Sequence, residues 1–554
     1  MTATSSAART TATARTCTEE LADVLVELGC EHLFTLMGAG NLWLIHHLDI
    51  RHGVPVHHLR HENGAVGAAD GYARATGRLG WCTVTQGPGF TNTITALLTA
   101  DRGRVPMVLL VSDTSNLDPE RFPFAGGVQA LAPELLLAPI GIATVRATGS
   151  DAAQQLREAA ARAVAESRPI VFVMPAGLDR LPAGPAAPPE PAATVPAVPV
   201  PADEVNAAAD AIDAAEHVVL LAGLGAVAAG AGGVDGPVAR LAELLGARVT
   251  TTVPAAGILG GHPAAAGPFG GFSIGATERL VQEADCIVAI GASLNLFQTR
   301  KGEFTRGRTV VRIDTDPAPA RSAARTVSIT GDARVATEAL VAEFERRGRT
   351  PVLLPPLPPE PVVGDVSTPG RIDPRALAVE LDRVLPADRR IFVDNGHFGA
   401  FPMLWLQHRA PRSLIWMPDF GAVGSSLAAS YAGAVADPHT QSVLFIGDCG
   451  LYLTLGDLET AVRERTPLVV VCMNDGAAGS ELAHMKDWGV PPDQAVFGYA
   501  DLAALGAGMG AQAAAIHGVE DLAPALAGWR REDGPLLLDC HISREVRSPI
   551  YDHV

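Results

Sequence analysis

The chain has 554 residues, of which 48% are hydrophobic and 18% are charged, and this composition is typical of a globular protein with a substantial core. Its formal net charge of −18 argues against nucleic acid or an anionic membrane as the main partner. The charge leaves room for a local anion site formed by backbone N–H groups and a metal ion. The seven cysteines are scattered and never in C-x-x-C spacing, so neither a disulfide framework nor a zinc site is expected.

The sequence contains no segment that predicts export or a membrane span. Its first residues, MTATSSAARTTATART, include no apolar run of the kind found in secretory signals, and we therefore expect a cytoplasmic protein. The longest uncharged apolar run, Val218 to Val234, is interrupted by five glycines. This pattern favours a strand, a glycine turn and a helix.

Two proline-rich stretches divide the chain. Between Pro182 and Pro201, and again between Pro351 and Pro361, prolines are too dense for a helix or a central strand, so both stretches are predicted to be extended linkers. They separate three blocks, residues 15–180, 202–345 and 370–554. In each block, short runs rich in Val, Ile and Leu alternate with helical stretches, as in parallel sheets covered on both faces. We therefore predict an α/β protein with three doubly wound parallel-sheet domains.

The first two blocks contain five of the expected strands. In the first block these are Met107–Val111 and Ile170–Val173, and in the central block His217–Leu221, Cys286–Ile290 and Thr309–Ile313. The first central strand is followed by Ala222-Gly223-Leu224-Gly225-Ala226. Its Gly-x-Gly pattern alone is a weak signal for a nucleotide site.

The third block carries the sharpest chemical signal. Its expected strands are Arg390–Val393, Ser442–Ile446, Leu468–Met473 and Leu536–Cys540. The second of these ends in Gly447-Asp448-Cys449-Gly450, a helical stretch from Leu455 to Arg465 follows, and the third ends in Asn474-Asp475-Gly476. A parallel pair with a crossover helix places Asp448 and Asp475 at the same sheet edge. Two carboxylates there can hold Mg²⁺. Phosphate oxygens and water then complete the coordination of the ion. The alternative is that both aspartates only cap helices.

These motifs resemble those of a known family. Gly447-Asp448 through Asn474-Asp475 resembles the thiamine diphosphate motif of the acetohydroxyacid synthase, benzaldehyde lyase and pyruvate decarboxylase family. The segments Arg60-His61-Glu62-Asn63-Gly64 and Gln86-Gly87-Pro88-Gly89 resemble its catalytic-glutamate region. The resemblance implies a pyrimidine-binding domain, a central Rossmann-like domain and a diphosphate-binding domain. Two departures stand out, because Cys449 replaces the third glycine of the motif and Asp475 replaces its second asparagine.

The resemblance also implies a role for each matching residue. Glu62 would hydrogen-bond the aminopyrimidine ring of thiamine diphosphate and act in catalysis. Val423 would support the bent cofactor, and the carbonyl of Gly421 would accept from its amino group. Asp448, Asp475 and the carbonyl of Ala477 would bind Mg²⁺. The remaining implied cofactor contacts are Asn395, Gly396, His397, Phe398, Gly447, Cys449, Gly450 and Ala478.

The reaction depends on the acid and base groups near the substrate. Pyruvate decarboxylases that resemble this chain have an aspartate in the first glycine loop and a His-His pair after a later strand. Here the loop is Met37-Gly38-Ala39-Gly40-Asn41, and Ser112-Asp113-Thr114-Ser115 contains no histidine. The pairs His46-His47 and His57-His58 occur elsewhere and are expected to be solvated. The missing proton donors make a simple decarboxylase the less favoured alternative.

Two further residues match catalytic positions of the family. Gln129 matches a glutamine that carboligases place near the substrate, and Glu481 matches an active-site glutamate of pyruvate decarboxylases. We therefore expect a carboligase of acetolactate synthase type, which decarboxylates a small 2-oxo acid and transfers the acyl unit to a second carbonyl. The alternatives are a decarboxylase or lyase of benzoylformate decarboxylase or benzaldehyde lyase type, and a non-catalytic cofactor-binding subunit.

The resemblance sets the expected cofactors and partners. They are thiamine diphosphate, Mg²⁺, a 2-oxo acid and, for a carboligase, an aldehyde or ketone acceptor. Synthases of the family bind FAD in the central domain, but many members bind nothing there, and FAD is the less favoured expectation here. Family sites lie between the first domain of one subunit and the third domain of another. A homodimer or homotetramer with inter-subunit active sites is therefore expected.

Overall fold

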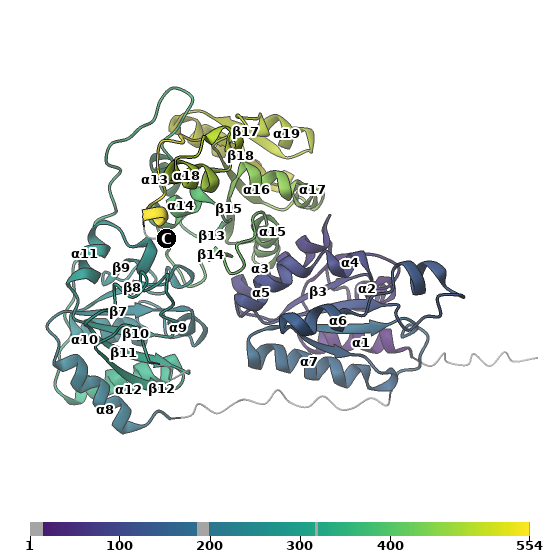
Figure 1. Ribbon diagram of the computed structural model, residues 1–554, viewed down its shortest axis with the longest axis horizontal. Coiled ribbons are helices and arrows are strands. Elements are labelled where there is room, and N and C mark those ends of the chain that lie inside the picture. Colours follow the sequence, from purple (N-terminus) through teal and green to yellow (C-terminus); the bar gives the residue numbers. More distant parts are fainter. Residues whose placement is uncertain (1–14, 185–198, 316–318, 553–554) are drawn as a thin grey trace, which may run out of the picture. The chain divides into compact units, whose positions relative to one another are not determined.

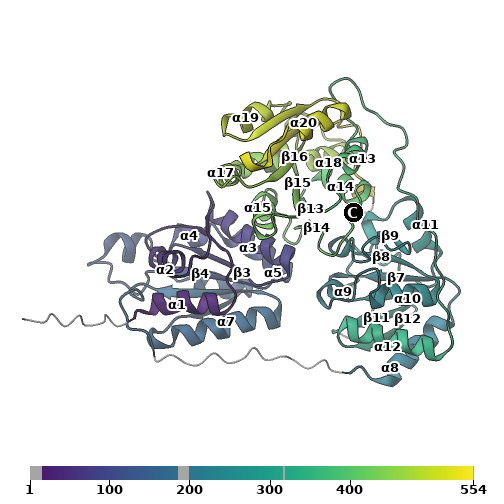
Figure 2. The same cartoon turned by 180° about the vertical axis from the view of Figure 1, so that it is seen from behind.

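The computed structural model describes residues 15–184, 199–315 and 319–552. The described chain forms two compact units: the first contains an N-terminal six-stranded sheet, and the second contains two further six-stranded sheets. Every paired strand in the three sheets runs parallel to its neighbours, with helices on the flanks, as Figures 1 and 2 show for each sheet. The predicted α/β class with three parallel-sheet domains is confirmed.

The first sheet has the strand order β2-β1-β3-β4-β6-β5. Helices α1 and α7 pack their apolar sides together on one face of it. The strands are β1 (Leu33–Leu36), β2 (Val56–His58), β3 (Gly80–Val84), β4 (Met107–Asp113), β5 (Ala143–Arg146) and β6 (Pro169–Pro175). The α-helices are α1 (Cys17–Glu27), α2 (Leu42–His52), α3 (Glu62–Thr76), α4 (Pro88–Thr91), α5 (Ile94–Arg102), α6 (Pro133–Leu137) and α7 (Ala152–Glu166).

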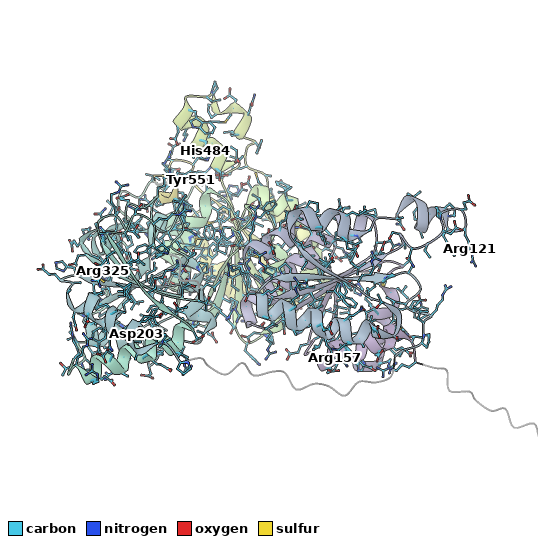
Figure 3. All side chains as sticks on the ribbon, turned by 60° about the horizontal axis from the view of Figure 1, so that its bottom comes forward. Arg121, Arg157, Asp203, Arg325, His484 and Tyr551 are labelled. Carbon is cyan, nitrogen blue, oxygen red and sulfur yellow. The ribbon has the colours of Figure 1, made fainter. Side chains whose placement is uncertain are left out.

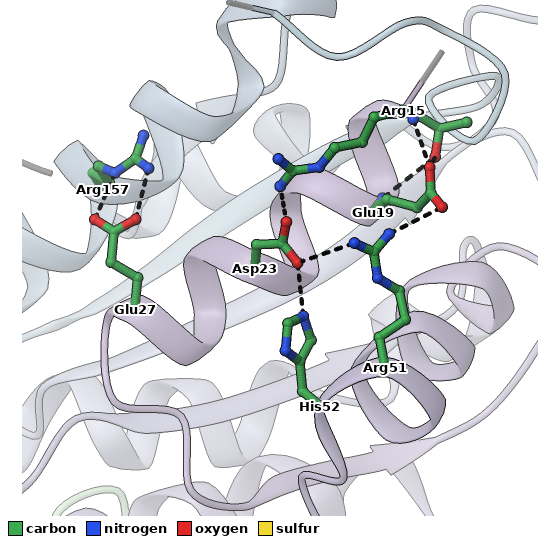
Figure 4. A network of polar contacts seen from close by, with 8 residues as sticks. Arg15, Glu19, Asp23, Glu27, Arg51, His52 and Arg157 are labelled. Atoms are coloured by element: carbon green, nitrogen blue, oxygen red, sulfur yellow. Dashed lines mark hydrogen bonds and ion pairs between the residues drawn. The ribbon is translucent and has the colours of Figure 1, made fainter. Parts of the chain in front are cut away.

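A polar network supports the packing of α1 against α2 and α7 (Figure 4). The guanidinium of Arg157 on α7 donates to both carboxylate oxygens of Glu27 on α1, at 2.9 and 2.7 Å. From α2, Arg51 lies 3.0 Å from the carboxylate of Glu19, and His52 lies 2.7 Å from that of Asp23. Because bidentate pairs fix orientation, these contacts set how the three helices align.

The central sheet has the order β12-β11-β10-β7-β8-β9. This is the doubly wound order, with its switch point between β7 and β10. The strands are β7 (Val218–Ala222), β8 (Arg248–Thr251), β9 (Ala265–Pro268), β10 (Cys286–Ile290), β11 (Thr309–Asp314) and β12 (Arg325–Thr330). The helices are α8 (Ala202–Asp213), α9 (Leu224–Ala228), α10 (Pro237–Leu245), α11 (Gly275–Glu283) and α12 (Ala333–Arg346).

The third sheet, β14-β13-β15-β16-β18-β17, repeats the topology of the first. Helices α13 and α14 pack on one face, and α15, α17 and α19 pack on the other. The strands are β13 (Arg389–Val393), β14 (Leu414–Trp416), β15 (Gln441–Gly447), β16 (Leu468–Asn474), β17 (Gln512–Ile516) and β18 (Leu536–His541). The helices are α13 (Pro374–Val384), α14 (Ala400–Trp405), α15 (Ser426–Ala436), α16 (Asp448–Leu453), α17 (Leu455–Arg463), α18 (Gly479–Trp488), α19 (Leu502–Gly508) and α20 (Leu522–Gly528).

The nine strands expected from the sequence are all present, with ends that differ by no more than two residues. The run from Val218 forms β7, a glycine turn and α9, as predicted. Residues 351–363 form neither helix nor strand, which agrees with an extended linker, whereas most of the other proline-rich stretch lies outside the described residues. Among the helices that the structure describes, none is long and apolar enough to cross a membrane.

The Gly-x-Gly pattern of the central sheet has a packing role. A Cβ added to Gly223 would lie 2.1 Å from the carbonyl oxygen of Gly291, and one on Gly225 would lie 2.8 Å from the Cα of Gly291. The N–H of Gly225 also donates to that carbonyl, at 3.0 Å. The glycines therefore allow two loops to meet backbone to backbone at the switch point, while FAD binding there stays the less favoured expectation.

We predict that Gly223→Val destabilises the protein, because the added atoms cannot fit against the Gly291 backbone. The expected loss is about 2 kcal/mol in the free energy of unfolding, measured by denaturant titration. Gly528→Ala is the control, since a Cβ there meets nothing within 4 Å. Equal stability of Gly223→Val and the wild type would contradict the packing role.

Candidate active site

Two acidic side chains meet at the carboxyl edge of the third sheet. Strands β15 and β16 are adjacent and parallel, with Gly447 paired to Met473. Asp448 follows directly as the first residue of α16, and Asp475 follows the end of β16. The predicted juxtaposition of these two residues is therefore confirmed.

The electrostatics of this pair favour a cation. Burial raises the pKa of Asp448 to about 6. Burial, and next the negative charge of Asp448, raises the pKa of Asp475 to about 7. A positive ion between such carboxylates stabilises their ionised forms, because it offsets both the burial and the repulsion.

The pair alone cannot fill the coordination sphere of a metal ion. Among the described residues, no group of three or more His, Cys, Asp or Glu side chains could hold a metal. Mg²⁺ prefers few protein ligands and keeps positions for phosphate oxygens and water. The two carboxylates therefore fit a magnesium ion that is shared with a phosphorylated ligand.

Glycines leave room beside the acidic pair. A Cβ on Gly479 would lie 2.7 Å from the Asp475 carboxylate, and one on Gly450 would lie 2.5 Å from Asp394 Oδ2. Asp394 follows β13 and accepts from the N–H of Gly424 at 2.7 Å. Burial raises the pKa of Asp394 to about 6. Gly450 and Gly479 therefore leave bare backbone beside these acidic side chains, and this cradle suits the close approach of a magnesium-bound diphosphate.

Cys449, the departure from the glycine pattern, fits this cradle. Its half-buried thiol points to the carbonyl oxygen of Ala477, at 3.6 Å. The N–H of Ala477 donates to Asp475 at 3.0 Å, and the N–H of Ala478 donates to the carbonyl of Ala495 at 2.8 Å. The predicted third ligand, the carbonyl of Ala477, therefore lies in the loop that carries Asp475.

The side chain of Asn395 is committed to the protein itself. Its Nδ2 donates to the carbonyls of Met417 and Ala422, at 2.9 and 2.6 Å, and its Oδ1 accepts from the indole of Trp416 at 3.1 Å. The carboxamide thus holds the loop that carries Gly421 and Val423. Gly421 has a left-handed φ of +73°, and the side chain of Val423 is 43% exposed in the single chain, so Val423 is not a core valine.

His397 is held by the C-terminal segment. The N–H of Ser548 donates to its Nε2 at 2.9 Å, and the ring of Tyr551 stacks on it at 5.5 Å. Tyr551 also lies beside His484, which Figure 3 labels together with it. Burial, helped by the charges of Arg547 and Lys486, lowers the pKa of His397 to about 4. The ring is therefore neutral near pH 7, and an accepting Nε2 leaves Nδ1–H as the donor.

The first unit carries a separate group of candidate residues. Glu62 begins α3, and its Oε2 accepts from Asn92 Nδ2 at 3.0 Å. Gln129 accepts from Gln86 Nε2 at 2.9 Å. The turn Gln86-Gly87-Pro88-Gly89 joins the two, since a Cβ on Gly87 would meet Gln129 and one on Gly89 would lie 3.7 Å from Glu62. This one short turn thus helps to position both the carboxylate of Glu62 and the carboxamide of Gln129.

Other predicted positions have different outcomes. Glu481 lies exposed in the first turn of α18, open to a ligand. Asn41 is buried and bonds Thr35 and Thr83, so it supports the glycine loop and faces no substrate. The expectation that His57 is solvated is wrong, because it is buried and lies 2.9 Å from the ring nitrogen of His32. Parallel pairing of β1 with β2 brings these histidines together, which the sequence did not indicate.

Three family models match segments of this chain. Residues 15–130 match the family described as thiamine pyrophosphate enzyme, N-terminal TPP binding domain. Residues 205–340 match its central domain, and residues 395–540 match its C-terminal TPP binding domain. The chain belongs to the thiamine pyrophosphate enzymes. It is therefore a thiamine-diphosphate-dependent enzyme of the class that forms or cleaves C–C bonds.

The relatives of this enzyme have several activities. It is 28% identical to a protein of Pseudomonas aeruginosa named probable 2-ketoarginine decarboxylase, over 94% of this chain and 93% of that protein. It is 26% identical to the acetolactate synthase of Arthrospira platensis (83% and 82%) and 24% identical to the sulfoacetaldehyde acetyltransferase of Alcaligenes xylosoxydans xylosoxydans (96% and 94%). Identity this low leaves the reaction type open.

Solved structures share the fold. The benzoylformate decarboxylase of Polynucleobacter necessarius superposes with a TM-score of 0.77 at 18% identity, over 96% of this chain and 99% of that one. The 4-hydroxybenzoylformate decarboxylase of Rhodococcus jostii RHA1 superposes with a TM-score of 0.77 at 21% identity, over 96% of this chain and 100% of that one.

We predict that magnesium-dependent binding of thiamine diphosphate weakens as the pH falls from 8 to 5.5. Both raised carboxyl pKa values mean that protons compete with the cation below about pH 7, so affinity rises with pH through that window. Titration of the apoprotein with Mg²⁺ at fixed cofactor measures this. Asp475→Asn should show a shallower pH dependence, and an identical profile in that variant would contradict the assignment.

Proposed function

We propose that this enzyme is a carboligase of acetolactate synthase type, which decarboxylates a small 2-oxo acid and transfers the acyl unit to an aldehyde or ketone. The observation that carries the proposal is the composition of the loops in the first unit. The glycine loop presents an exposed Met37 and a buried Asn41, with no acid. Near it, Gln129 offers a neutral carboxamide. A site with few proton donors favours attack on a second carbonyl over protonation.

Each half of the proposed site has its own task. Thiamine diphosphate, when bound, would supply a carbanion that adds to a carbonyl and a thiazolium ring that takes up the electron pair left behind when carbon dioxide departs. Glu62, oriented by Asn92, would exchange a proton with the aminopyrimidine ring. Asp448 and Asp475 would hold Mg²⁺ with the carbonyl of Ala477, and His397 Nδ1–H would donate to the diphosphate. The backbone at Gly396, Phe398, Gly447 and Gly450 would line the cradle.

The proposed assembly is a homodimer or homotetramer with each active site between two subunits. In it, Glu62 of one subunit and the acidic pair of another serve the same cofactor. The exposed side chain of Val423 supports this, because a residue that props a bound cofactor must reach beyond the core of its own domain.

A 2-oxo acid decarboxylase is the second candidate, and Glu481 favours it. This carboxylate is exposed at the start of α18, next to the loop that carries Asp475. A carboxyl group there could deliver the proton that releases an aldehyde. The decarboxylase names among the relatives and the structural neighbours agree with this candidate.

We predict that Glu62→Gln lowers turnover by at least about 100-fold, the usual contribution of acid–base catalysis, while cofactor affinity changes little. Steady-state kinetics and a cofactor titration separate the two effects. Glu158→Gln, which removes an exposed carboxylate from α7, is the matched control and should keep full activity. Retained turnover in Glu62→Gln would contradict the proposed catalytic role of Glu62.

Product analysis distinguishes the two candidate reactions. Carbon dioxide release is measured across a panel of 2-oxo acids, with and without aldehyde or ketone acceptors. For a carboligase, we expect hydroxyketone products that increase with acceptor concentration. Stoichiometric aldehyde release, unchanged by acceptors, would establish the decarboxylase instead.

A further inference from the structure

Arg544 is fixed over the loop that carries Asp475. Its Nε donates to the main-chain carbonyl of Asp475, and one terminal nitrogen lies 3.4 Å from the carbonyl of Gly476. Gly476 has a φ of +63°, and a Cβ there would lie 2.8 Å from that nitrogen. A glycine at this position therefore lets the guanidinium come close to the loop backbone.

The guanidinium itself is held by an aromatic ring. Arg544 lies 4.6 Å from the ring centroid of Tyr499, and Arg371 lies 3.5 Å from the same centroid. The hydroxyl of Tyr499 donates to the carbonyl of Ile542 at 3.1 Å. Two cations on one ring repel each other, so this arrangement needs negative charge nearby.

For Arg544, the acidic pair supplies negative charge nearby. Where the family motif has a neutral asparagine, this chain has Asp475, which adds one negative charge beside Asp448. A diphosphate brings further negative charge to the same cradle. The charge of Arg544 acts on both carboxylates and opposes the rise in their pKa values. The guanidinium of Arg544 therefore lies close to Asp475, the departure from the motif that adds negative charge.

We propose that Arg544 is a positioning residue that compensates the extra charge of Asp475, so that the loop accepts a magnesium-bound diphosphate. The inference rests on the proposed cofactor site. Arg544 acts through the loop and its charge, and it takes no part in bond making. Its partner in this role is Asp475, which stands where the family motif has a neutral asparagine. The effects of substituting Arg544 and Asp475 are therefore expected to depend on each other.

A double-mutant cycle tests the proposal. Binding of thiamine diphosphate to the apoprotein is measured with Mg²⁺ and without substrate, by calorimetry or quenching of tryptophan fluorescence. Arg544→Gln should weaken binding at least about tenfold, the effect of one nearby charge. Adding Asp475→Asn should restore the affinity to within about threefold of the wild type. Arg544→Lys, which keeps the charge, should bind better than Arg544→Gln.

Controls keep the alternatives apart. Arg383→Gln removes the same charge from α13, where Arg383 pairs with Glu380, and should bind like the wild type. If the wild type itself fails to bind cofactor with Mg²⁺, the proposed function fails. If the wild type binds and Arg544→Gln binds equally well, the role of Arg544 is overturned. Weak binding that Asp475→Asn does not rescue also overturns it, since a purely structural role predicts that result.

Discussion

The like charges of Asp448 and Asp475 are the constraint on which the third domain depends. Adjacent parallel strands bring them together, and the crossover through α16 and α17 keeps them at one edge. Burial raises the pKa of Asp448 to about 6, and burial together with the charge of Asp448 raises that of Asp475 to about 7, so ionisation of both groups is unfavourable without a cation. A Cβ on Gly479 would collide with the carboxylate of Asp475, and one on Gly450 would collide with that of Asp394. The ionised carboxylates of Asp448 and Asp475 therefore repel each other, and a bound divalent cation reduces this repulsion.

The first and third sheets share one topology and use it differently. In both, the switch point lies between the first and third strands in sequence, where ligands of α/β sheets bind. In the first unit this point is filled by protein, since Asn41 bonds Thr35 and a Cβ on Gly40 would lie 2.3 Å from Gln86. In the third sheet, loops of glycine and aspartate leave a cradle. The same topology therefore provides a preorganised turn beside Glu62 and an anion site beside Asp448.

The sequence predicts those features that arise from continuous local patterns. Apolar runs locate the strands, and the residues after β15 and β16 locate the acidic pair, because parallel pairing leaves little freedom. Contacts between segments distant in sequence were not predictable in this way. Asn395 matches the family loop that contacts the phosphates, and the bonds of its carboxamide to the loop of Gly421 have no signal in the local sequence. Arg544 lies 69 residues beyond Asp475, in a segment whose composition carries no signal of its contact. Such contacts depend on tertiary geometry, which no local periodicity encodes.

Cys449, one departure from the family motif, contacts the loop that carries the other, Asp475. Burial raises the pKa of Cys449 to about 11, and the charges of Asp448, Asp475 and Glu481 raise it in the same direction. The thiol therefore stays protonated near neutral pH and is a poor nucleophile, despite its position at the cofactor cradle. A protonated thiol can donate to the carbonyl of Ala477, the predicted third magnesium ligand, so this side chain lies against the loop that carries Asp475. An asparagine at 475 would remove one of these smaller charge contributions, and burial would still keep the thiol protonated, so the cysteine at 449 does not depend on the aspartate at 475 for its protonation state.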